Sequence, residues 1–169
     1  SQMTVEEIGD HHWDQLFKLA SPISEKLLCN DEGTQKYVDH FYNRSEGFLQ
    51  LLKDDGVYDY YMDAMKSDGA MMAMLNDYRA AFTYDVPRLR EELESGIKLQ
   101  MPALILWGEK NGNLCKSPAM DIWEPRCTEM EGHGIKCGHY IPEEKPEETL
   151  GYLIPFADKC FENGVQKNI

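Results

Sequence analysis

The first part of the chain, residues 11–98, repeats apolar positions three and four residues apart, which is the spacing of amphipathic α-helices. One predicted helix is capped by Asp31 and another by Ser67 or Asp68, because these side chains favour the position before the first turn. The apolar face of the first helix consists of Tyr37, Val38, Phe41 and Tyr42. The apolar face of the second consists of Met71, Leu75, Tyr78 and Phe82.

The pattern changes in residues 99–169. The apolar run at residues 103–107 lies between Pro102 and Gly108, as is typical of a buried parallel strand. A second short strand is expected at residues 134–137. Between the strands, Ser117 and Pro118 begin a predicted helix. The element order of helices, strand, helix, strand and helix predicts an α/β fold with a small parallel sheet.

The final predicted helix begins at Pro146 and extends to about Phe161. Pro155 lies within it and is expected to kink or interrupt it. Its expected buried face consists of Leu150, Leu153, Ile154, Ala157 and Phe161.

Composition excludes several function classes. With 17 Lys and Arg against 30 Asp and Glu, the net charge of −13 would repel nucleic acid and anionic lipid. We expect no membrane span and no signal peptide, since no run of about 18 apolar residues occurs. The 5 cysteines contain no CxxC pair, which favours reduced thiols in the cytoplasm and no metal site. Ser1 and Gln2 before Met3 suggest a tag remnant ahead of an initiator methionine.

The segment from Cys137 to Glu144 indicates chemistry most directly. His139 follows the second predicted strand, and the acidic turn that begins at Pro146 comes shortly after it. This arrangement would hold an imidazole at the end of a strand, where it can take up and release protons.

Three segments resemble the α/β-hydrolase superfamily, in its haloacetate dehalogenase and epoxide hydrolase branch. They are Asn76-Asp77-Tyr78-Arg79-Ala80-Ala81, Leu104-Ile105-Leu106-Trp107-Gly108 and the Gly138-His139 loop with its Pro-Glu-Glu sequence. His12-Trp13 is a weaker match. The resemblance implies the second half of that fold: a helical cap at residues 1–98, then the last strands and helices of the core at residues 99–169.

The resemblance also implies roles for individual residues. His139 would be the general base, while Tyr78, His12 and Trp13 would face the substrate; Trp107, at the strand end, is a further substrate-binding candidate. In the complete family, an Asp nucleophile forms an ester with the substrate and the histidine activates water to hydrolyse it. The segments that carry the nucleophile and the usual acid do not occur in this sequence. The alternative position for the acid, three residues past Gly108, is occupied by Asn111. No cofactor is implied.

Each candidate also has a structural interpretation. Tyr78 and Phe82 could belong to a Met-rich core, and His12-Trp13 could simply begin an amphipathic helix. Cys137 is a possible nucleophile, although the ring of His139 leaves from the loop rather than the strand. The glutamates after His139 suit a helix N-terminus, and one of them could orient the histidine.

Half of a hydrolase fold would expose the apolar edge of the strand at residues 103–107. We therefore expect a homodimer or a partner chain that completes the sheet. Three functions stay open: hydrolysis of a small haloacid, ester or epoxide, acid–base chemistry without a nucleophile, or binding without catalysis. The second would make the chain an isomerase, cyclase, dehydratase or decarboxylase of a hydrophobic metabolite.

Overall fold

A computed structural model describes residues 13–110 and 119–166. The chain divides into two compact units, residues 1–91 and 92–169. The division lies near the expected cap boundary at residue 98, within the helix Val86–Glu94.

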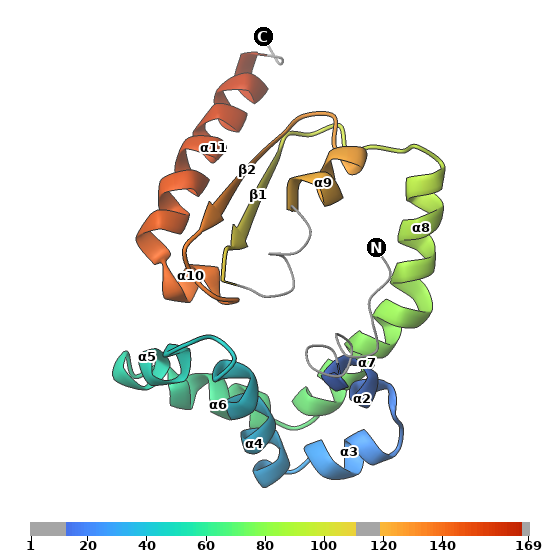
Figure 1. Cartoon of the computed structure of the whole chain (residues 1–169), viewed down its shortest axis with the longest axis vertical. Helices are drawn as coiled ribbons and strands as arrows, with labels where there is room; N and C mark the ends of the chain where they lie inside the picture. The colour runs from blue at the N-terminus through green and yellow to red at the C-terminus, as the bar shows by residue number, and fades with distance from the viewer. Residues whose placement is uncertain (1–12, 111–118, 167–169) are drawn as a thin grey trace. The chain divides into compact units, whose positions relative to one another are not determined.

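The first unit is helical throughout the part that the structure describes (Figure 1). Its helices are α2 (Trp13–Leu19), α3 (Ile23–Leu28), α4 (Asp31–Tyr42), α5 (Phe48–Asp54), α6 (Tyr58–Lys66), α7 (Ala70–Ala80) and the beginning of α8 (Val86–Glu94). A π-helical turn, η1 (Ala81–Asp85), joins α7 to α8. The helical prediction for this region is confirmed, because its apolar spacing persists over several turns.

Four of these helices meet in one hydrophobic core. The core consists of Leu28, Val38, Met62, Met71 and Leu75. Val38, Met71 and Leu75 were expected on the apolar faces, and all three are buried. Phe82 does not continue the face of α7, because the helix changes to the π-helical turn after Ala80 and leaves this ring 42% exposed.

The predicted helix caps are wrong by one or two residues. Asn30, rather than Asp31, caps α4: its side-chain oxygen accepts a hydrogen bond from the Gly33 N–H at 2.9 Å. Asp31 instead lies in the first turn, where its charge is favourable. Helix α7 follows Gly69, whose positive φ of 78° turns the chain without a side-chain cap. Local spacing alone does not choose between adjacent capping residues.

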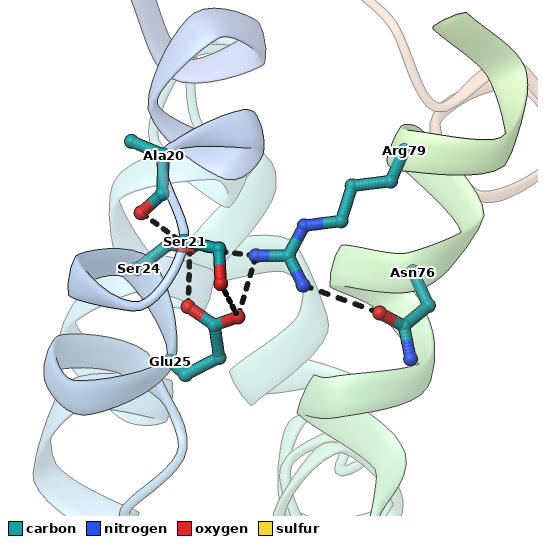
Figure 2. Close-up of polar contacts among 6 residues, drawn as sticks. All are labelled: Ala20, Ser21, Ser24, Glu25, Asn76 and Arg79. Carbon is teal, nitrogen blue, oxygen red and sulfur yellow. Dashed lines mark hydrogen bonds and ion pairs between the residues drawn. The ribbon is translucent and has the colours of Figure 1, made fainter. Parts of the chain in front are cut away.

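A polar network joins α3 to α7 (Figure 2). The Arg79 guanidinium lies 2.8 Å from the Glu25 carboxylate and 3.0 Å from the Ser24 hydroxyl. Glu25 also accepts hydrogen bonds from Ser21 at 2.8 Å and Ser24 at 3.1 Å. A hydrogen bond from its own backbone, followed by those from Ser21, Ser24 and Arg79, lowers the pKa of Glu25 from 4.5 to about 2. Arg79 therefore has a structural role within this unit.

Replacing Glu25 with glutamine is expected to flatten the acid dependence of stability. Because its pKa is lower in the folded chain, the Glu25 contribution is present above pH 4.5 and is lost as the pH falls toward 2. Urea midpoints at pH 7, 4.5, 3 and 2 measure this effect. Glu46→Gln, which removes an exposed acid, is the matched control. An unchanged acid slope in Glu25→Gln would contradict the prediction.

The second unit is built on a parallel strand pair. β1 (Ala103–Gly108) pairs with β2 (Met130–Ile135), and the register aligns Ala103 with Met130 and Gly108 with Ile135. The remaining elements are α9 (Ala119–Trp123), the 3-10 turn η2 (Glu124–Arg126), α10 (Ile141–Glu144) and α11 (Pro146–Gln166). This is the expected small parallel sheet, and the chain has the architecture of an α/β half domain.

The second strand begins earlier than predicted. Its sequence, MEGHGI, contains two glycines and two polar residues, so it lacks the apolar run expected of a buried strand. The strand ends at Ile135, where the Cys137 N–H donates a hydrogen bond back to the Ile135 carbonyl at 2.7 Å. Residues 136–137, which were predicted to be strand, therefore belong to the loop before His139.

Helices cover the two faces of this small sheet (Figure 1). On the face toward α9, the Met120 side chain packs closely against Gly132. A Cβ atom at residue 132 would lie 2.3 Å from the Met120 sulfur. On the opposite face, the His133 ring stacks on the Tyr152 ring of α11, with centroids 4.1 Å apart. Gly132 thus lets α9 approach β2, and the alternation of β2 side chains separates the two faces.

The prediction of which residues the last helix buries is wrong. α11 continues through Pro155 to Gln166, and its predicted core residues Leu150, Leu153, Ile154 and Phe161 are 46–75% exposed. A sheet of two strands is too narrow to cover all the apolar side chains of so long a helix.

No described helix is long and apolar enough to cross a membrane.

Candidate functional site

The loop that carries His139 begins where both strands of the sheet end. The Glu109 N–H donates to the Ile135 carbonyl at 2.8 Å, and the Lys110 N–H donates to the Cys137 carbonyl at 2.9 Å. These bonds attach the loop to the end of β1. His139 therefore lies at the carboxyl edge of a parallel sheet, where α/β folds bind their ligands.

Gly108 permits the closest contact between the strand end and this loop. A Cβ atom at residue 108 would lie 1.7 Å from the Gly138 carbonyl oxygen, and backbone atoms cannot yield as a side chain can. Residue 108 therefore has to be glycine for the loop to lie against β1.

Gly108→Ala is expected to destabilise the second unit by about 1–3 kcal/mol, because the added methyl group forces the loop away from β1. Gly151→Ala is the matched control: a Cβ atom there meets nothing within 4 Å, so alanine is expected to stabilise α11 by about 0.5–1 kcal/mol. Urea unfolding measures both changes. Equal stability of the two variants would contradict the close contact.

The carboxylate of Glu144 holds the backbone on both sides of His139. One oxygen accepts the Gly138 N–H at 2.7 Å, and the other accepts the Tyr140 N–H at 3.0 Å. The His139 side chain itself is exposed, with its ring edge-on to Tyr140 at a centroid distance of 5.1 Å. The loop thus combines a held backbone with an imidazole that is exposed to solvent.

Cys137 is unsuited to be the nucleophile. The side chain is buried, and burial raises the pKa of its thiol above 9.0, with a further increase from the negative charges of Glu144 and Glu148. The thiolate, which is the reactive form, is therefore disfavoured at neutral pH.

Trp107 shares the second unit with His139 and lies at the same end of the sheet. A Cβ atom on Gly132 or Gly134 would lie 3.1 Å from its indole, so the ring covers these two glycines of β2. Packing against the sheet accounts for the position of Trp107. Its role in substrate binding stays a prediction.

The first unit places Tyr78 against a buried lysine. The Lys18 ammonium lies 3.4 Å from the centroid of the Tyr78 ring and 5.1 Å from that of Phe41. It also forms an ion pair with Asp14 at 3.0 Å, and both of these charged side chains are at most 4% exposed. Arg44 lies 3.5 Å from the other Asp14 oxygen. One face of Tyr78 is therefore occupied by a cation of the protein itself.

This buried ion pair was not expected from the sequence. The pattern that encodes it is an aspartate followed four residues later by a lysine, which is also common on exposed helix surfaces. Trp13 is 43% exposed and lies near Phe17 and His40, at ring distances of 6.2 and 5.8 Å. His12 and Asn111 lie outside the described residues.

The site candidates thus fall into two sets. His139 and Trp107 belong to the second unit, whereas Tyr78 and Trp13 belong to the first. Across residues 13–110 and 119–166, no group of three His, Cys, Asp or Glu side chains could hold a metal ion. The group that indicates chemistry is the exposed imidazole of His139, on a loop whose backbone is held by Glu144 and by the end of β1.

No protein-family model matches the sequence. Solved structures do match its fold. A proposed acyltransferase from Salmonella enterica has a TM-score of 0.80 and 18% identity, over 94% of this chain and 51% of its own. A proposed epoxide hydrolase from Pseudomonas aeruginosa has a TM-score of 0.79 and 23% identity, over 96% and 53%. Cfl2 from Burkholderia cenocepacia has a TM-score of 0.74 and 25% identity, over 92% and 50%.

This chain therefore spans about half the length of the solved proteins that it matches. The match includes both the helical unit and the strand-containing unit, since it extends over more than nine tenths of this chain. Together with the parallel strand pair and its helices, it shows a partial α/β-hydrolase-like fold.

Proposed function

We propose that this chain supplies the general-base half of an enzyme that hydrolyses a small organic substrate, such as a haloacid, an ester or an epoxide. His139 is the base and activates the water molecule. The observation that carries this proposal is the exposed imidazole on a loop held between the end of β1 and Glu144. The likeness to a proposed epoxide hydrolase supports the reaction class.

A nucleophile has to come from outside these 169 residues, either from more of the same polypeptide or from a partner chain. Two features support a completing half. The solved structures are about twice as long, and the apolar side chains of Leu104, Ile105 and Leu106 on β1 are only half-buried. A parallel strand of this composition is normally covered on both faces.

In the second unit, Trp107 is the proposed substrate-binding residue. In the helical unit, Tyr78, Trp13 and His12 are separate candidates for binding a substrate. Because the Lys18 ammonium covers one face of the Tyr78 ring, only its edge, hydroxyl group or other face could meet a ligand. We propose a location in a reducing compartment such as the cytoplasm. The free cysteines of the described residues support it: Cys29, Cys127, Cys137 and Cys160.

The test compares the recombinant 169-residue chain with material purified from its own source. Both are assayed for halide release from haloacetate, diol formation from an epoxide and hydrolysis of a p-nitrophenyl ester. We expect activity in the source material and none in the isolated chain. Hydrolysis by the isolated chain would contradict the need for a second half, and no hydrolysis by either sample would contradict the reaction class.

A further inference from the structure

We propose that Glu144 is the positioning residue of His139: its carboxylate fixes the backbone on both sides of the histidine and thereby directs the imidazole. This inference rests on the proposed function, in which His139 is the base. It assigns to Glu144 a role that differs from the role of Glu147 and Glu148, whose charges lie at the N-terminus of α11.

The geometry around Glu144 forms a closed ring. Its two carboxylate oxygens accept the N–H groups of Gly138 and Tyr140, which lie on either side of His139. The backbone N–H of Glu144 in turn donates to the Tyr140 carbonyl at 2.8 Å, so the glutamate is held by the segment that it holds. This reciprocity is similar to a capping box at a helix N-terminus. Bonds to an ionised acceptor are about twice as strong as neutral ones.

The other contacts described for the loop involve residues that precede His139 in the sequence. The Lys110 backbone N–H donates to the carbonyl of Cys137, and Gly108 packs against the carbonyl of Gly138. Neither reaches Tyr140, so the carboxylate of Glu144 is the described contact that connects the two sides of the histidine. The negative charge of Glu144 also helps to raise the pKa of the buried Cys137 thiol, as expected of a carboxylate that faces the inside of the loop.

The test uses Glu144→Ala and Glu144→Gln, with Glu147→Gln as a control that removes a nearby exposed charge. Amide hydrogen exchange at Gly138 and Tyr140 is measured by NMR in the chain itself. We expect exchange to become at least about tenfold faster in Glu144→Ala, less so in Glu144→Gln, and to stay unchanged in the control, because the first variant loses both acceptors. Unchanged exchange at both amides in Glu144→Ala would overturn the proposal.

A kinetic readout separates positioning from general stabilisation. In the source-derived enzyme, Glu144→Gln is expected to lower kcat about 10- to 100-fold with KM within about twofold, because a misdirected base still permits substrate binding. Faster exchange throughout the unit, or a parallel change in KM, would assign Glu144 a merely structural role and overturn the proposal. If His139→Ala leaves activity intact, the proposed function fails, while exchange at Gly138 and Tyr140 still decides whether Glu144 holds the loop.

Discussion

Replacing Lys18 with methionine is expected to lower the free energy of unfolding by about 3–5 kcal/mol. Methionine fills a similar volume but leaves the Asp14 carboxylate buried, with the Arg44 guanidinium 3.5 Å away. It also removes the ammonium that lies over the Tyr78 ring. Urea unfolding of the wild type and the variant measures the difference.

Two further variants test the physical cause of this loss. Lys36→Ala breaks another pair of an acidic residue and a lysine four positions apart, but both partners, Lys36 and Glu32, are about three-quarters exposed. We therefore expect no measurable change. The double variant Asp14→Leu/Lys18→Met removes both buried charges, so it is expected to recover most of the stability lost in Lys18→Met. A double variant as unstable as the single one would show that shape, rather than charge, determines the loss.

Replacing His139 with alanine is expected to lower kcat about 10²- to 10⁴-fold in the source-derived enzyme, since this is the usual contribution of a general base. If the histidine activates the water that opens an ester intermediate, the variant should still form that ester. Intact-mass analysis after incubation with substrate would then show a covalent adduct on the nucleophile-bearing half. Neither the adduct nor the loss is expected in His133→Ala, whose ring stacks on Tyr152 away from the loop.

Full activity in His139→Ala would contradict the role of His139. Loss of activity without an adduct would instead favour the acid–base chemistry considered from the sequence, in which no nucleophile takes part.

Much of the fold could be predicted from the sequence because its apolar residues recur at clear helical spacing, and a continuous apolar run marks β1. The helical region, the strand at β1 and the position of His139 after a strand follow from local patterns that the folded chain keeps. Strand β2 was placed too late because its glycines and polar residues hide the strand pattern. Those glycines are explained by Met120, Trp107 and Glu109, which lie against them from elsewhere in the chain.

The features that were missed depend on contacts between distant residues or on atomic geometry. The exposure of Leu150 and Phe161 on α11 depends on how many strands lie beneath the helix, which an amphipathic pattern does not report. The burial of Asp14 and Lys18 depends on aromatic rings from two other helices. The role of Glu144 could be suspected from its position after His139, but not distinguished from that of its acidic neighbours without the hydrogen bonds.

Native mass spectrometry of the protein purified from its own source shows whether this chain works with a second half. We predict that the 19.5 kDa sequence occurs with a second, nucleophile-bearing half, either as a partner chain or within a longer polypeptide. A monomer or homodimer made only of 19.5 kDa subunits would contradict it. His139 would then have no nucleophile to serve, and proton transfer or binding alone would be the function to assay.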